Sequence, residues 1–260
     1  MSGEISAFFS ALDPLCGPVG IFSLFNSGSL VACGDAGWGD EIASGVWMTI
    51  TLAIVTLPVG LTIGFLIALA AQSEDRLLRL AAGIYTTIFR GLPELLTLFL
   101  IYYGLQILIQ AVFSWFGYDE RIEINAFAAG VAALSVVFSS YAAEVLLSAF
   151  RAIPRGQYEA GDSLGLHRWR TMRLIVLPQL IRIALPGLTN LWLILLKDTS
   201  YASAIGLAEI LRQTGIAARV SKEAFFFYGI ACLLYLILAT ISSVGLGFIE
   251  RSVKRSEVAR

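Results

Sequence analysis

The sequence predicts an all-α membrane protein with about five transmembrane helices. Of its 260 residues, 57% are hydrophobic and only 14% are charged, and the mean hydropathy is +0.79. Soluble domains usually carry about 25% charged residues. Four windows contain no charged residue, and each is long enough to supply the ~20 apolar residues that cross a bilayer. These windows are 42–73, 95–118, 124–143 and 224–249.

A fifth apolar run, 183–196, is shorter and lies between two basic residues, Arg182 and Lys197. This run crosses the bilayer only if the guanidinium group of Arg182 reaches the interface and the helix continues past Lys197. Two further apolar pieces, 77–88 and 201–211, are too short to cross and are expected to lie along the membrane or dip into it. The five predicted spans are 45–72, 86–113, 124–148, 177–198 and 225–249.

The basic residues predict the orientation of the chain, because cytoplasmic loops carry an excess of arginine and lysine. Residues 1–44 contain five acidic residues and no basic one, which favours an extracytoplasmic N-terminal segment. With five spans in the transmembrane domain 45–249, the arginine-rich loop 151–176 and the basic tail 250–260 then lie in the cytoplasm. We therefore expect the N-terminus outside and the C-terminus inside.

The composition also disfavours several classes of function. A net charge of −1 leaves no basic surface for nucleic acid. Three cysteines and one histidine make no metal cluster, and no nucleophile with a partner base suggests a catalytic site. Cys16 and Cys33 could form a disulfide if their segment lies outside the cytoplasm, and the sequence leaves this open.

One polar segment interrupts the apolar pattern, "IPRGQYEAGDSLGLHRWRTMRLIVLP" at 153–178. Pro154 favours a helix start, so 155–164 is predicted to be a short helix. Gly165 is placed to end that helix in a left-handed conformation. A second helical piece is expected at 167–172. On physical grounds the segment is either a solvated connector or a handle for a soluble partner.

The spacing within this segment resembles the EAA signature of bacterial ABC-importer permeases, E-A-A-x3-G-x9-I-x-L-P. Gly161 departs from it, since alanine is usual there and glycine costs a helix about 1 kcal/mol. The stretches 90–106, 139–157 and 177–210 are similar to the polar amino acid uptake permeases for histidine, basic amino acids and opines. The resemblance extends from about Gly37 to the C-terminus. The residues matching the signature are Glu159, Ala160, Gly165, Ile175, Leu177 and Pro178.

The resemblance implies a type I ABC-importer permease fold, in which the loop helix is a coupling helix. It implies a bacterial inner-membrane protein that works with two copies of a cytoplasmic ATPase, a second permease subunit that is related but different, and a periplasmic binding protein. The chain has no G-x-x-x-x-G-K-[ST] motif, so ATP and its hydrolysis are expected to belong to the partner, and no cofactor is expected here. The residues expected to couple to the ATPase are Tyr158, Glu159, Ala160, Gly161, Leu164 and Gly165.

The expected function is that of a permease subunit importing amino acids or their derivatives. Opine, histidine and arginine all remain open as substrates, and a homodimer of permeases remains open beside a heterodimer. The competing hypotheses are a secondary carrier and an intramembrane enzyme. A secondary carrier would transport its substrate alone and without nucleotide.

Ionisable residues within the spans are costly and therefore mark candidate functional sites. Arg90 and Glu94 flank a proline and are four positions apart, so they are expected to pair on one helical face. The pair is either structural or part of the substrate pathway. Glu144 lies near the inner end of the third span, at the interface.

A second polar cluster, Lys197 to Ser200, closes the fourth span. It precedes "SYASAIGLAEI", which could break the helix, and interrupted helices often bind charged substrates. Lys197 and Asp198 offer both charges that a zwitterion needs, or they neutralise each other and position a scaffold. Together with Arg90 and Glu94, the predicted pathway residues are Lys197, Asp198, Thr199 and Ser200.

Overall fold

The structure is a computed structural model that describes residues 16, 30–34, 37–117 and 125–258, and its regular elements are all helical in this part of the chain. Most of the predicted N-terminal segment 1–44 and the end of the tail lie outside the described residues. The helices are α2 (Gly39–Gln72), α3 (Arg76–Gly91), α4 (Glu94–Trp115), α5 (Ala126–Ala152), α6 (Arg155–Ser163), α7 (Arg168–Thr171), α8 (Leu177–Asp198), α9 (Ile210–Ser221) and α10 (Ala224–Val258).

Five helical segments of the described chain are long and apolar enough to cross a membrane, which confirms the predicted number. They are Gly39–Gln72, Glu94–Trp115, Ala126–Ala152, Arg168–Ile205 and Ala224–Val253. The fourth is longer than predicted because a π-helical turn, Met172–Val176, joins α7 to α8 without a break. A 3₁₀ turn, Thr199–Ile205, extends α8 at its other end.

The predicted start of the second span, at residue 86, is wrong. Leu92 has extended backbone angles, φ −87° and ψ 145°, and the next helix starts only after Pro93. A residue that precedes proline is disfavoured in the helical conformation, since the ring clashes with its backbone. The apolar piece at 77–88 consequently belongs to a separate helix, α3, and the span is α4 alone.

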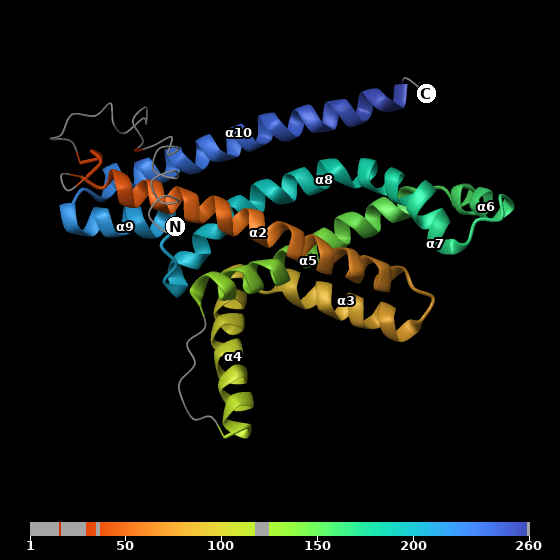
Figure 1. Ribbon diagram of the computed structural model, residues 1–260, viewed down its shortest axis with the longest axis horizontal. Coiled ribbons are helices and arrows are strands. Elements are labelled where there is room, and N and C mark those ends of the chain that lie inside the picture. The colour runs from red at the N-terminus through yellow and green to blue at the C-terminus, as the bar shows by residue number, and fades with distance from the viewer. Residues whose placement is uncertain (1–15, 17–29, 35–36, 118–124, 259–260) are drawn as a thin grey trace, which may run out of the picture.

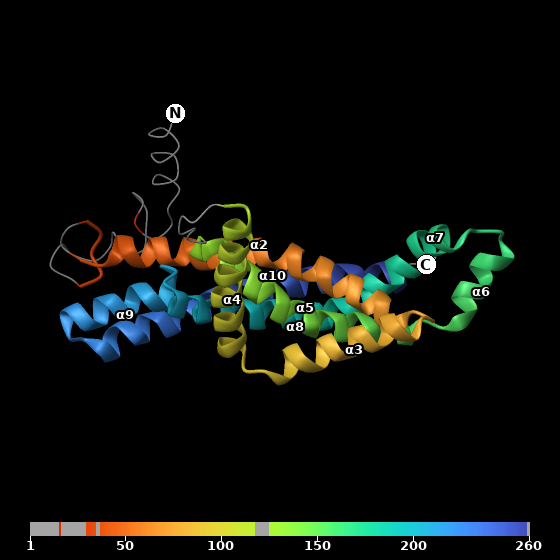
Figure 2. The same cartoon turned by 90° about the horizontal axis from the view of Figure 1, so that it is seen from below.

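The molecule is an elongated bundle with a distinct element at each end (Figure 1). Helices α2, α5, α8 and α10 follow the long axis, whereas α4 runs across it in both views (Figure 2). Helices α6 and α7 lie at one end of the long axis, the end toward which α10 also runs. Helix α9 lies at the opposite end, with the start of α2.

Close packing of α2 on α5 forms the centre of the bundle. A Cβ atom added to Gly64 would lie 2.9 Å from the Cβ of Ala142 and 2.9 Å from the carbonyl oxygen of Ser139. The glycine therefore lets the two backbones approach closely.

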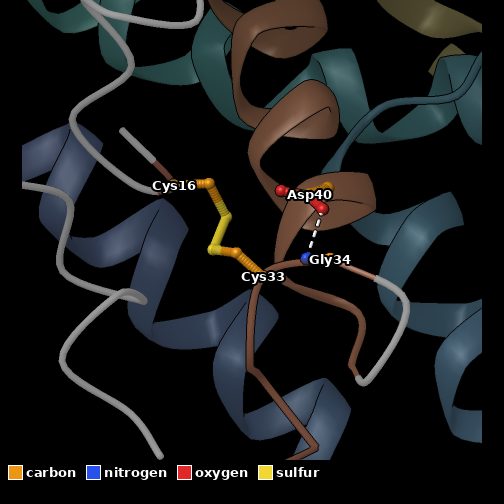
Figure 3. Close-up of a disulfide and its surroundings, with 4 residues drawn as sticks. All are labelled: Cys16, Cys33, Gly34 and Asp40. Atoms are coloured by element: carbon orange, nitrogen blue, oxygen red, sulfur yellow. Dashed lines mark hydrogen bonds between the residues drawn. A yellow bond between two sulfur atoms is a disulfide. The ribbon is translucent and has the colours of Figure 1, made fainter. Parts of the chain in front are cut away.

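A disulfide joins Cys16 to Cys33 before the start of α2 (Figure 3). Beside it, the backbone nitrogen of Gly34 donates a 2.6 Å hydrogen bond to Oδ2 of Asp40. The two sulfurs and this carboxylate lie within 4.8 Å of one another. Sulfurs bonded to each other offer no thiolate to a metal. The disulfide therefore links two parts of the chain that precede α2, and the hydrogen bond to Asp40 connects them to the first turn of this helix.

Candidate functional site

Two carboxylates from different helices line one cleft between α4, α5 and α8. Glu94 lies in the first turn of α4, where the helix dipole favours an acid, and Asp198 is the last residue of α8. We call this space the acidic cleft. Its volume is about 10 Å³, room for about one water molecule, so no amino acid fits in this conformation. Apolar side chains complete its lining: Leu98, Ala133, Leu134, Val137, Phe138, Leu191, Ile194 and Leu195.

Tyr141 of α5 completes the polar lining of the acidic cleft. Its hydroxyl donates a 3.4 Å hydrogen bond to Oε1 of Glu94. The guanidinium carbon of Arg90 lies 5.7 Å from the centre of the Tyr141 ring, within the range of a cation–π contact. Tyr141 thus connects the carboxylate of the cleft to the cation at the end of α3.

The expected ion pair between Arg90 and Glu94 is not formed. Nη1 of Arg90 lies 3.3 Å from Oε1 of Glu144 on α5. The expectation assumed one continuous helix through both residues, whereas the break at Leu92 and Pro93 puts them on different helices. Arg90 therefore joins α3 to α5, and Glu94 faces the acidic cleft without an ion pair to any basic residue that the structure describes.

The four polar residues at the end of α8 have different environments. Lys197 is exposed and does not line the acidic cleft, and it forms no ion pair with Asp198. Thr199 is fully buried, and its hydroxyl donates a 2.7 Å hydrogen bond to the carbonyl oxygen of Leu196, so the end of its own helix satisfies it. Ser200 is half-buried and is not among the residues that line the cleft. Asp198 alone of this group lines the cleft.

The predicted helix break after the fourth span is present. The 3₁₀ turn ends at Gly206, whose φ of +96° is a left-handed conformation that glycine adopts without strain. The chain then turns into α9.

The sequence-based prediction missed Glu209, whose side chain is fully buried. It caps α9 by accepting hydrogen bonds of 2.8 Å from the backbone nitrogens of Leu211 and Arg212, and Tyr235 of α10 donates a third, also 2.8 Å long. Burial raises the pKa of Glu209, and these donors partly offset that rise. An acidic residue directly before an amphipathic run is a helix-start signal that could have found it.

The polar loop has the predicted conformation. Helix α6 ends at Ser163, and Gly165 follows with φ +71°. The backbone nitrogen of Leu166 donates a 3.0 Å hydrogen bond to the carbonyl oxygen of Gly161, which ends the helix in a Schellman motif. Of the six residues expected to couple to a partner, Tyr158 is half-buried and Gly161 is buried. The others are exposed, namely Glu159, Ala160, Leu164 and Gly165.

Comparisons with known proteins identify the family. The profile described as "Binding-protein-dependent transport system inner membrane component" matches residues 60–255. The nopaline transport system permease protein NocQ of Agrobacterium fabrum is 42% identical over 218 residues, 84% of this chain and 92% of that protein. The arginine ABC transporter permease protein ArtQ of Haemophilus influenzae is 38% identical, over 81% of this chain and 92% of that protein.

The histidine/lysine/arginine/ornithine transport system permease protein HisQ of Escherichia coli is 34% identical, over 85% of this chain and 99% of that protein. A solved amino acid ABC transporter with histidines is 34% identical, with a TM-score of 0.70 over 83% of this chain and 95% of the other. The MetNI methionine ABC transporter, at 18% identity and a TM-score of 0.67, shares the fold. The chain belongs to the family of binding-protein-dependent transport system inner membrane components.

Proposed function

We propose that this chain is the permease subunit of an ATP-driven importer for amino acids or opines with a cationic group. The observation that carries this proposal is the acidic cleft. In the described part of the chain, Glu94 and Asp198 form no ion pair, although both lie among apolar side chains. Both carboxylates are half-buried within membrane-spanning helices. A charge at membrane depth without a counter-ion is costly, so a cationic solute that supplies the counter-charge is favoured there.

The names of two relatives support the same substrate class, because they name amino acids with basic side chains. Arginine, lysine and ornithine, for which ArtQ and HisQ are named, each carry a side-chain cation. The cleft holds about one water molecule, so the bundle must open before such a solute can enter it. We propose that ATP hydrolysis in a partner drives this opening.

The proposed partner contact is the outer face of α6. In this arrangement a cytoplasmic ATPase dimer contacts Glu159, Ala160 and Leu164, whose side chains are exposed. A second permease, related to this chain, completes the pathway, and a periplasmic binding protein delivers the solute at the end that carries α9. The start of α2 is then periplasmic and the C-terminal end of α10 is cytoplasmic.

The test of this proposal is co-purification of the ATPase with the permease, followed by nucleotide-dependent uptake after reconstitution with all partners. Gly165→Val forces a β-branched residue into a left-handed turn, at a cost of about 1–2 kcal/mol or more, and redirects the chain after α6. We expect loss of the ATPase and of uptake, with the spans still inserted. Gly165→Asn is the matched control, since asparagine tolerates this conformation.

Two results would overturn the proposal. Full ATPase binding and full uptake by Gly165→Val would mean that the loop is a connector. Uptake by the wild-type chain alone, without nucleotide or ATPase, would identify a secondary carrier.

A further inference from the structure

A second and larger cavity lies behind the loop, away from the acidic cleft. Its volume is about 650 Å³, and its lining comes from the ends of α2 and α5 and from α6, α7 and the first residue of the π turn. Three arginines line it: Arg151 at the end of α5, Arg155 at the start of α6 and Arg168 at the start of α7. We call it the arginine cavity.

The three arginines have no carboxylate partner in the described part of the chain, where the ion pair formed is that of Arg90 with Glu144. Two carboxylates, Glu74 and Asp162, also line the arginine cavity, which leaves one net positive charge. Guanidinium groups present planar pairs of donors that match phosphate oxygens. The three arginines are exposed and line one cavity without a carboxylate partner among the described residues, so their guanidinium donors are available to an oxyanion there.

A buried hydroxyl gives the second, independent indication of a ligand. Thr171 lines the arginine cavity, is 4% exposed, and its Oγ1 has no hydrogen-bond partner. Tyr158 also lines the cavity, and its buried hydroxyl lies beside Gln72 without a hydrogen bond of good geometry. Oγ1 of Thr171 is shielded from solvent and lies on the side of Gly161, so a rotation of the Thr171 side chain would give this unpaired hydroxyl a bound oxygen as its partner.

We propose that the arginine cavity binds a phosphate group, supplied by an anionic lipid headgroup or by free phosphate. The cavity lies where α2 and α5 end, at the end of the bundle that carries the loop. The lipid source rests on the proposed cytoplasmic placement of this end, where basic pockets between membrane helices meet anionic headgroups. The proposed phosphate site is independent of which substrate the protein transports.

The experiment is native mass spectrometry of the full-length permease with its co-expressed partners in neutral detergent. Phosphatidylglycerol is titrated in one arm and inorganic phosphate in the other, with phosphatidylcholine as the neutral lipid. We expect Arg151→Gln/Arg168→Gln to weaken phosphatidylglycerol binding at least about tenfold, because two charge-assisted hydrogen-bond donors are lost. Arg170→Gln is the matched control, since this exposed arginine of α7 does not line the cavity.

Two further variants separate the site from loss of folding. Arg151→Lys/Arg168→Lys keeps both charges and is expected to recover part of the affinity. Thr171→Val keeps the shape and all charges, and is expected to weaken binding by several-fold through loss of the hydroxyl alone. Saturable binding of inorganic phosphate that competes with the lipid supports free phosphate as the ligand. Binding of phosphatidylglycerol without binding of inorganic phosphate supports the lipid.

The proposal is overturned if the double Gln variant binds phosphatidylglycerol as the wild type does, or if Arg170→Gln weakens binding equally. Loss of the ATPase from the double Gln variant with unchanged lipid binding would assign the arginines to the ATPase contact instead. None of these readouts depends on transport, so failure of the proposed function leaves this test intact.

Discussion

The hydroxyl of Tyr235 donates a 2.8 Å hydrogen bond to Oε2 of Glu209, which ties α10 to the first turn of α9. The same carboxylate caps the backbone nitrogens of Leu211 and Arg212. Glu209→Ala leaves these donors without an acceptor, at a cost of about 1–3 kcal/mol for each buried one. We expect a clear fall in the unfolding temperature of the purified protein, and a smaller fall for Tyr235→Phe.

The pH dependence of this effect has a definite sign. Burial raises the folded-state pKa of Glu209, so its stabilising contribution is complete below the ordinary glutamate pKa and is lost as pH rises through the raised value. The unfolding temperature of the wild type relative to Glu209→Gln should therefore fall as pH rises across that window. A difference that grows with pH would contradict the burial of the carboxylate.

The departure of Gly161 from the family signature has a structural reason. A Cβ atom there would lie 2.5 Å from Cγ2 and 2.6 Å from Oγ1 of Thr171, a β-branched residue with little rotamer freedom. Forcing an extra methyl group into a packed site typically costs ~1–3 kcal/mol of stability. Replacing glycine by alanine stabilises a helix by only ~1 kcal/mol, so we expect the steric cost at position 161 to dominate. We expect Gly161→Ala to open the loop, with tryptic cleavage at its arginines about fivefold faster or more.

Gly156 supplies the control on the same helix, because a Cβ atom there would meet nothing within 4 Å. Gly156→Ala should slow cleavage or leave it unchanged. Gly161→Ala/Thr171→Ala should return toward the wild-type rate. Equal cleavage of the two single variants would show that α6 does not need the close approach to α7.

The presence of four of the five spans could be predicted from the sequence because a bilayer imposes a length on charge-free windows. The helix end at Gly165 was also predictable, since the signal is local. The pairing of Arg90 was not, because it depends on the break before Pro93 and on the placement of α5. The acid at Glu209 could have been recognised as a helix cap, but its burial depends on Gly45 and Tyr235, which approach from other helices.

The disulfide gives a test of topology. Disulfides persist in oxidising compartments such as the periplasm, so an N-terminus outside the cytoplasm predicts that Cys16 and Cys33 are joined in cells. Cys232 is the third cysteine and is free. Thiol labelling of denatured protein, counted by mass, should add one label before reduction and three after it. In Cys232→Ser the counts should be none and two. Three labels on wild type before reduction would contradict the topology.

If the carboxylates of Glu94 and Asp198 face the transported cation, the transporter should distinguish arginine from citrulline through them. Citrulline has nearly the shape of arginine but no side-chain charge. Uptake of both solutes is measured in proteoliposomes that contain the complete transporter, for wild type, Asp198→Asn and Glu94→Gln. Glu223→Gln is the control, since this acid is exposed and is not among the residues lining the cleft.

We expect Asp198→Asn and Glu94→Gln each to lower the ratio of arginine to citrulline uptake by about tenfold, the equivalent of about 1.4 kcal/mol of lost charge interaction. Glu223→Gln should keep the wild-type ratio. An unchanged ratio in both cleft variants, with the ATPase still bound, would contradict this role of the two carboxylates.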